Sequence, residues 1–492
     1  DEGTLTPYTF VFGYPGRLLL GLVYDTLLVK DAANELHPLL ATAWSSDGTG
    51  QVWTIAVRDD AVWHDGVPLT ADDVAFTFEY AAQQSRGPWT AGANDLDAIT
   101  VDDDTVTISL TRPVPDFVYR LADVEIIPRH VWAEVDDPAA ATAELTIGSG
   151  PFTLAEYRQD QFYRFEVNPE YALGTPQVGE IVVSVIPEPS TTFAAVSSGE
   201  LDATTVPLEP QLVDTFGGDD IELVSGASYA PTLLQLNTDR APFDDPAFRA
   251  AMATAIDPTE LVDIVMLGQA TAPNAGFTHP ESPFGRSAID HVHDPELAAT
   301  QLDEAGYPLE GDVRVDASGE PVSVELLVYA NRPLRIRTAE LIAEQLGAVG
   351  IGVQVTPLDA ETVDDLVWPG FDVSQGRDFD MAIWGWSAPV MLEAGRLGSL
   401  VHSDPGRGAL NIGGYRSDAA DAIVDELVVT ADPSQVDELI TELVELIATD
   451  RPFITLYYED RVFPFRPAAY DGWVFRAGDG IVQKLSVVDY GL

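Results

Sequence analysis

The chain has 492 residues, enough for two to four folding units at roughly 150 residues each. Its 80 acidic and 25 basic residues give a formal net charge of −55 at pH 7, which repels nucleic acid and anionic membranes and excludes both as expected partners. No cysteine is present, which excludes disulfides, thiolate metal sites and a cysteine nucleophile, and no apolar run reaches the roughly 18 residues of a membrane span.

The acidic excess has two interpretations. It is either a solvated surface, suited to high salt or to an exported protein, or a surface that concentrates cationic ligands. In both cases like charges repel most strongly at low ionic strength, so we expect the stability of the fold to rise with salt.

Helices and strands are expected to alternate along the chain. In the first half of the chain the patterns predict a strand at 52–57, a helix at 71–84 capped by Thr70, and strands at 105–110, 162–167, 181–186 and 233–236. They then predict helices at 246–256, 258–266 and 295–305, a strand at 322–328 and a helix at 334–348. Strands at 352–356 and 381–384, a helix at 433–448 and a strand at 453–458 complete the prediction. Residues 87–95 and 271–286 are expected to be loops. This alternation predicts an α/β architecture.

Asp–Pro pairs predict four helix starts, at 245–246, 257–258, 294–295 and 432–433. The aspartate carboxylate accepts amide hydrogens that have no partner in the first turn, and proline at the first helical position has none to satisfy. Glu260, three residues after Asp257, is expected to act in a capping box. Gly306 is expected to end the helix that starts at Pro295.

Several motifs keep one order and spacing over about residues 3–465, nearly the whole chain. They are LVYDTL at 22–27, PLLATAW at 38–44, WHDG at 63–66, GSGPF at 148–152, NPEY at 168–171, SGELD at 198–202, AID at 255–257 and EAGY at 304–307. Together they resemble solute-binding protein family 5, the oligopeptide, dipeptide and nickel binding proteins of ABC importers.

The same motifs also have structural interpretations. Asp65-Gly66 is expected to form a tight turn with glycine at positive φ, and His64 to belong to the scaffold. For Gly148 and Gly150 two roles stay open, namely backbone geometry and backbone contact with a ligand.

The resemblance implies a periplasmic-binding-protein-like type II fold of the α/β class, with two lobes joined by a hinge. Lobe I then has a main subdomain of residues 1–43, 147–232 and 455–492 and carries an extra inserted subdomain, residues 44–146; lobe II is residues 233–454. Two chain crossings, near 232 and 455, would form the hinge. A ligand that contacts both lobes only in the closed form shifts the population towards closure.

By the same resemblance we expect a monomeric extracytoplasmic receptor, periplasmic or at the cell surface. It would capture an oligopeptide-like solute in the cleft between the lobes and deliver it to the permease subunits of an ABC importer. An oligosaccharide-binding receptor of the same family is the alternative ligand class. A ligand-binding sensor or chaperone-like interaction protein without a transport role is the alternative function. The first residues carry no export signal, so an exported chain would have lost it, and a lipid anchor would need a thiol upstream of residue 1.

One departure from the family concerns the ligand. In peptide-binding members a loop after a lobe II strand reads roughly G-W-x-A-D, and its aspartate pairs with the peptide's amino group. Here the stretch is Gly385-Trp386-Ser387-Ala388-Pro389. Proline has neither charge nor amide hydrogen, and a buried cation without a partner costs several kcal/mol. The other acids that could take the aspartate's place are Asp372, Asp378, Asp380 and Glu393.

Aromatic residues supply most of the expected ligand contacts. Trp384 and Trp386 lie two apart at a strand end and should share a face. With Trp368 they would form a platform for sugar rings or apolar side chains, or else fill the core of lobe II. The other expected contacts are Ser387, Ala388 and Pro389 of the loop, Phe12 and Tyr14 before the first helix, Trp89 in a loop of the inserted subdomain, and Asn411 and Tyr415 in a turn similar to one of the family.

No catalytic or cofactor motif stands out. The sequence has no HExxH, GxSxG or P-loop pattern. His291 and His293 lie beside Asp290 and Asp294, but Asp294 is already assigned to a helix cap. We therefore expect no metal site, no cofactor and no enzyme activity.

Overall fold

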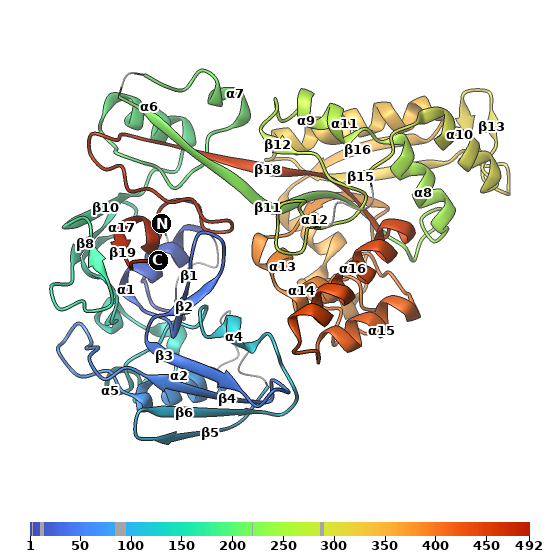
Figure 1. Ribbon diagram of the computed structural model, residues 1–492. Coiled ribbons are helices and arrows are strands. Elements are labelled where there is room, and N and C mark those ends of the chain that lie inside the picture. Colours follow the sequence, from blue (N-terminus) through green and yellow to red (C-terminus); the bar gives the residue numbers. More distant parts are fainter. Residues whose placement is uncertain (2, 10–13, 84–94, 219, 286–289) are drawn as a thin grey trace. The chain divides into compact units, whose positions relative to one another are not determined.

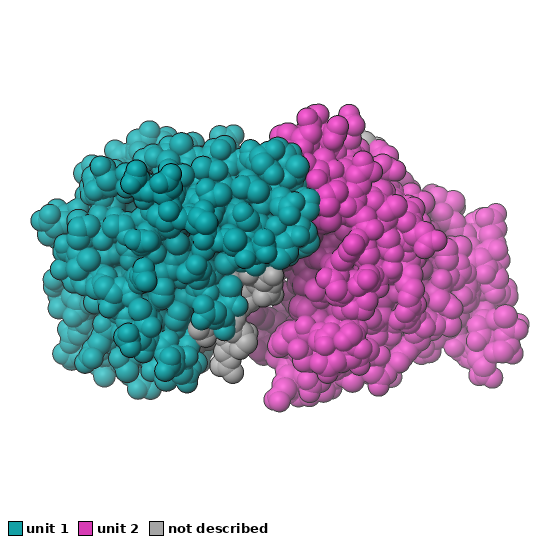
Figure 2. All heavy atoms as spheres, turned by 90° about the horizontal axis from the view of Figure 1, so that it is seen from below, with its two compact units in different colours: residues 1–226, 461–492 teal, residues 227–460 magenta. Residues whose placement is uncertain are grey.

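The computed structural model describes residues 1, 3–9, 14–83, 95–218, 220–285 and 290–492. It divides into two compact units (Figure 2): unit 1 comprises residues 1–226 and 461–492, and unit 2 comprises residues 227–460. No helix in these ranges combines the length and apolar character needed to cross a bilayer. The unit boundaries lie six residues outside those expected for lobe II on each side, at 226/227 and 460/461.

Unit 1 contains a four-stranded antiparallel sheet in the order β3-β4-β6-β5. Its strands are β3 (Ala41–Ser46), β4 (Val52–Val57), β5 (Leu96–Asp102) and β6 (Thr105–Leu110). Helix α2 (Ala71–Gln83) buries Val74 and Phe78 in the same core as Trp53 and Ile55 of β4. This sheet lies within residues 44–146 apart from the start of β3, and the subdomain status of that range stays a prediction.

The rest of unit 1 is built from small sheets and short helices (Figure 1). The strands are β1 (Leu28–Lys30) paired with β2 (Leu36–Pro38), the three-stranded sheet of β7 (Phe152–Arg158), β8 (Phe162–Val167) and β10 (Glu180–Ser184), and β9 (Thr175–Pro176) paired with β19 (Val488–Asp489). The helices are α1 (Tyr14–Val23), α4 (Phe117–Arg120), α5 (Arg129–Trp132), α6 (Pro189–Ser198), α7 (Pro210–Val213) and α17 (Lys484–Val487).

Unit 2 is organised around a six-stranded mixed sheet in the order β12-β18-β11-β17-β15-β16. The strands are β11 (Glu222–Leu236), β12 (Ala270–Thr271), β15 (Ser323–Tyr329), β16 (Gly352–Leu358), β17 (Met381–Gly385) and β18 (Phe453–Phe465). Strand β11 runs antiparallel to β17, whereas β17, β15 and β16 run parallel to one another. A short hairpin of β13 (Leu309–Glu310) and β14 (Val313–Arg314) lies apart from this sheet.

Helices cover both faces of the sheet, because successive side chains of its strands enter different cores. Met381 and Ile383 of β17 pack in one core, and Ala382 and Trp384 in the other. The first core takes side chains from α8 (Pro246–Ala255), α9 (Pro258–Ile264), α10 (Pro295–Glu304) and α11 (Pro333–Ala348). The second takes them from α12 (Ala360–Val367), α13 (Ala388–Leu392), α14 (Ala394–Ser399), α15 (Asp418–Leu427) and α16 (Pro433–Asp450). The predicted α/β architecture is thus confirmed.

Two strands cross the boundary between the units. Strand β11 starts in unit 1 and ends in unit 2, and β18 returns from unit 2 to unit 1. The sequence predicted only part of each, residues 233–236 and 453–458. Tyr229 lies in β11 close to the boundary at a φ of 56°, where an L side chain is strained.

Candidate functional site

The end of β17 gathers three indoles in unit 2. Trp384 lies on the strand and Trp386 just after it, 6 % and 9 % exposed, and both pack in the same core. Their ring centroids are 6.3 Å apart, and that of Trp368, the residue after α12, is 5.6 Å from that of Trp386. The expectation that Trp384 and Trp386 share a face is confirmed.

The indoles belong to a longer aromatic row, two members of which the sequence pattern did not indicate. The ring centroid of Tyr329, at the end of β15, lies 5.9 Å from that of Trp384. The ring centroid of Phe371 lies 5.3 Å from that of Trp368. Phe371 is 65 % exposed, so the row leads from the core of unit 2 to solvent. No sequence signal joined Tyr329 to the tryptophans, because the parallel pairing of β15 and β17 brings it there.

Two indole N–H groups of this row are buried without a hydrogen-bond acceptor among the described residues, Trp368 Nε1 and Trp384 Nε1. A buried donor without an acceptor costs about 1–3 kcal/mol. The row therefore has unused donors as well as an apolar surface.

Arg335, near the start of α11, lies beside the row. Its guanidinium carbon is 5.7 Å from the ring centroid of Tyr329. A Cβ at position 385 would lie 2.9 Å from Arg335 Nη2, so Gly385 leaves room for this side chain. Among the described residues Arg335 forms no ion pair with a carboxylate, although the chain has 80 acidic residues. The end of β17 thus carries a half-buried positive charge.

The loop after Trp386 starts a helix. Ser387 is the N-cap residue of α13, with an exposed side chain that makes no capping hydrogen bond. Ala388 is buried and Pro389, half-buried, lies in the first turn. Their contact with a ligand stays a prediction, and no carboxylate stands at position 389.

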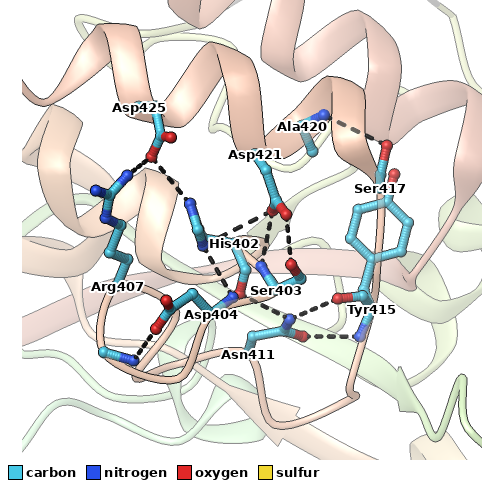
Figure 3. Close-up of polar contacts among 11 residues, drawn as sticks. His402, Ser403, Asp404, Arg407, Asn411, Tyr415, Ser417, Ala420, Asp421 and Asp425 are labelled. Carbon is cyan, nitrogen blue, oxygen red and sulfur yellow. Dashed lines mark hydrogen bonds and ion pairs between the residues drawn. The ribbon is translucent and has the colours of Figure 1, made fainter.

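Asn411 and Tyr415 lie elsewhere in unit 2, in the loop that follows α14 (Figure 3). The Asn411 amide donates to the backbone oxygens of His402 and Tyr415 and accepts from the Tyr415 amide. The Tyr415 hydroxyl donates to Asp450. These contacts hold the loop in shape, and Tyr415 packs in the same buried core as Trp384 and Trp386; contact of Asn411 and Tyr415 with a ligand stays a prediction.

A buried histidine organises the same loop, and the sequence analysis missed it. His402 Nδ1 accepts the amide hydrogen of Asp404 at 3.0 Å, so the ring proton lies on Nε2, which faces Asp425 at 3.1 Å. Asp421, one turn before Asp425 on α15, accepts from the Ser403 amide (Figure 3). Both ring nitrogens have hydrogen-bond partners, so His402 supports the shape of the loop.

Three predicted residues cannot be placed. Phe12 and Trp89 lie outside the described residues, and Tyr14 is the first residue of α1, with a side chain that is not described. Their contacts with a ligand stay predictions.

A cluster of charges in unit 1 surrounds a small pocket of about 70 Å³. Both lysines of the chain line it. Lys30 pairs with Asp123 at 2.9 Å, and Lys484 with the fully buried Asp25 at 2.6 Å. Glu125 also lines the pocket, 5 % exposed, and its Oε2 has no hydrogen-bond partner among the described residues. Burial raises the pKa of Glu125 to about 7, the kind of shift that marks candidate functional groups.

Candidate metal ligands are already engaged in the described parts of the chain. The one group of three that comes together there is Asp31, Glu35 and His37. Asp31 accepts the amide hydrogens of Ala33 and Glu35 and faces the His37 ring, as a turn residue does.

The two histidines singled out in the sequence are engaged as well. His291 Nε2 lies 2.9 Å from the Ile256 carbonyl oxygen, and His293 lies 3.2 Å from Asp257. Each contact engages one ring nitrogen of its histidine.

Comparison with known proteins gives one family. The model of the bacterial extracellular solute-binding proteins, family 5 Middle, matches residues 35–407. An ABC transporter peptide-binding protein of Brucella ovis is 29 % identical over 316 residues, 63 % of this chain and 58 % of the relative. The matched region thus spans less than two thirds of that relative's length.

Two further relatives cover more of the chain. The oligopeptide-binding protein AppA of Bacillus subtilis is 24 % identical over 452 residues, 89 % of this chain and 81 % of the relative. The crystal structure of the ABC transporter substrate-binding protein CtaP of Listeria monocytogenes superposes with a TM-score of 0.86 at 19 % identity, over 99 % of this chain and 97 % of that one. This likeness shows the fold.

Proposed function

The chain belongs to family 5 of the bacterial extracellular solute-binding proteins, and from this premise we propose that it is the extracytoplasmic receptor of an ABC importer for an oligopeptide-like solute. The family match over residues 35–407 carries the proposal, because it includes parts of both units. The relatives from Brucella ovis and Bacillus subtilis are named for peptide binding. The receptor binds its solute and releases it unchanged to the permease subunits.

We place the solute-binding residues of unit 2 at the end of β17. The aromatic row supplies an apolar surface for side chains, with Phe371 at its exposed end. Hinge closure of the two lobes around the solute belongs to the proposal. The two crossing strands, β11 and β18, support it, since two connections permit closure without breaking either core.

The charge at this end of the sheet indicates which part of a peptide is bound here. Pro389 offers no carboxylate to an ammonium group, whereas Arg335 offers a guanidinium without an ion-pair partner in the described chain. A guanidinium matches the two oxygens of a carboxylate. We therefore propose that the site holds the acidic end of the peptide.

A thermal-shift panel tests the proposal. Di- to hexapeptides with free carboxyl ends should raise the melting temperature saturably, and the same peptides with amidated ends should raise it much less. Arg335→Gln should remove that difference, and Trp386→Phe should weaken binding of both series. Trp44→Ala, which changes a half-exposed indole of unit 1, serves as the control and should bind as the wild type does.

Two outcomes would overturn parts of the proposal. A shift with α- or β-linked oligosaccharides and none with peptides would assign the receptor to sugars. Full peptide binding by Trp386→Phe and Arg335→Gln would move the site away from the end of β17. Mass spectrometry of material that co-purifies with the protein identifies the natural solute.

A further inference from the structure

A polar pocket of unit 2, of about 550 Å³, lies beyond the start of β17, at the end opposite to Trp386. Leu236 of β11 pairs with Met381, the first residue of β17, so the pocket residues Asn237 and Asp239 lie beyond the start of β17. Trp386 follows the end of the same strand. None of the residues of the aromatic row lines the pocket, although Tyr415 of its lining packs in the same core as Trp384 and Trp386.

Three arginines line this pocket: Arg240, Arg377 and Arg416. Asp239 is the one carboxylate among the described lining residues, in a chain with 80 acidic and 25 basic residues. Asp239 accepts from Arg377 at 2.7 Å and also pairs with Arg416. Two guanidinium groups thus share the one carboxylate of the described lining.

Of the three arginines, Arg377 has the least complete hydrogen bonding. Its side chain is 12 % exposed, and its Nε is buried without an acceptor in the described chain. Burial lowers the pKa of Arg377, the charge of Asp239 opposes that shift, and the positive charge of Arg416 adds to it. A buried guanidinium that lacks acceptors is suited to a planar or tetrahedral oxyanion.

The backbone is shaped around this cluster. Gly414 has a φ of 72°, and a Cβ there would lie 1.5 Å from Arg377 Nη1 and 2.6 Å from an Asp239 carboxylate oxygen. Any larger residue would displace the Arg377–Asp239 pair. Arg240, also held by Asp378 and Asp380 at 2.7 and 2.9 Å, has a fixed guanidinium at the rim.

We propose that this pocket binds a small organic molecule through an oxyanion, a phosphate or carboxylate group held by Arg377, Arg416 and Arg240. The volume of the pocket lies within the range of small-molecule sites, roughly 300–1,000 Å³, which is more than a bare phosphate needs. Asp239 orders the guanidinium groups and competes with the bound anion for them. Asn411 and Tyr415, two of the contacts expected from the sequence, line this site, whereas no residue of the aromatic row at the end of β17 does.

Titration with inorganic phosphate and with citrate tests the proposal, at constant ionic strength maintained with sodium chloride. The expected result is a saturable rise in melting temperature with at least one of the two, and the two titrations separate phosphate from carboxylate recognition. Arg416 is 71 % exposed, so Arg416→Gln should fold normally and weaken binding roughly tenfold, the factor that about 1.4 kcal/mol represents. Arg337→Gln, at an exposed arginine of α11, should bind as the wild type does.

The variant Asp239→Asn distinguishes an anion-binding role of the arginines from a structural role alone. Removal of the competing carboxylate should strengthen anion binding several-fold, whereas arginines with a structural role alone would lose stability and gain no anion response. The absence of a saturable response to both anions would overturn the proposal, as would equal binding by wild type and Arg416→Gln. The peptide panel is independent, because Arg416→Gln should leave peptide binding unchanged.

Discussion

At the scale of single residues, Glu125 is the clearest source of pH dependence. Its pKa is raised from 4.5 to about 7 because the carboxyl group is buried. Between these values the folded state holds a proton that the unfolded state releases, so stability falls as pH rises. Glu125 should stabilise the fold fully below pH 4.5, and this contribution should be lost by pH 7 and above.

Glu125→Gln should therefore be about as stable as the wild type near pH 4.5 and more stable above pH 7. The expected gain is up to about 3 kcal/mol, from the size of the pKa shift. Urea unfolding of both proteins from pH 4.5 to 8 measures the difference. Glu144→Gln, at an exposed glutamate of the same unit, should show no such trend with pH. A stability difference between Glu125→Gln and the wild type that does not change with pH would contradict the raised pKa of Glu125.

Residues with local roles could be predicted from the sequence. Gly66 has a φ of 81°, as the Asp65-Gly66 turn required. His64 is part of the scaffold as expected: its Nε2 donates to the Gly150 carbonyl oxygen, and its Nδ1 accepts from the Gly148 amide. Burial lowers the pKa of His64, in keeping with this neutral ring.

Residues whose partners are distant in sequence could not be predicted. A Cβ at Gly148 would lie 1.9 Å from the Val23 carbonyl oxygen, so close packing explains this glycine, and the same backbone explains Gly150. The sequence left packing and ligand contact open because Val23 is far along the chain. Arg335 was missed for the same reason, since only the pairing of β15 with β17 brings it to Gly385.

At the scale of elements, helix starts were the most predictable feature. The side chains of Asp245, Asp257, Asp294 and Asp432 each accept an amide hydrogen of the first turn, as expected. The predicted helices agree with the observed ones to within two residues at each end. Capping is local chemistry, so four residues of sequence suffice to show it.

The capping box at α9 is indirect. Glu260 does not reach back to the Asp257 amide; Gln345 of α11 lies between them, accepting from the Asp257 amide at 3.1 Å and donating to Glu260 at 2.7 Å. The motif Asp257-x-x-Glu260 was recognised, but its third member comes from another helix.

Gln345→Ala should consequently destabilise the protein by about 1–3 kcal/mol, because it leaves a helix-start amide and a carboxylate without their partner. Glu344→Ala, at the exposed neighbouring position, should change stability far less. Denaturant midpoints of the two variants make the comparison, and equal values would show that water replaces the glutamine at no cost.

Strands were less predictable than helices. The second part of β18 contains Glu459, Asp460 and Arg461, and the first part of β11 contains Gly226 and Pro231. The first part of β11 lacks the apolar pattern of a core strand. In β18 the charged residues 459–461 interrupt that pattern at the unit boundary, before Val462, Phe463 and Phe465, which are buried in unit 1. Their length follows from their connecting role.

At the scale of the whole molecule, charge should govern stability. With a net charge of −55, repulsion within the folded chain is strongest where counter-ions are few. We expect the melting temperature to rise continuously from low to molar sodium chloride. Scanning calorimetry at fixed pH gives the measurement, and an unchanged melting temperature would show that the carboxylates are too far apart to repel.

The discontinuity of unit 1 has a consequence for biosynthesis. Unit 2 is one uninterrupted stretch, residues 227–460, whereas unit 1 needs residues 461–492 as well as 1–226. Strand β9 has no partner until β19 exists, and the buried carboxylate of Asp25 has no lysine until Lys484 has been added. On the ribosome the chain lengthens by about 5–20 residues per second. The half of the protein that is translated first is therefore the last that can reach its final form.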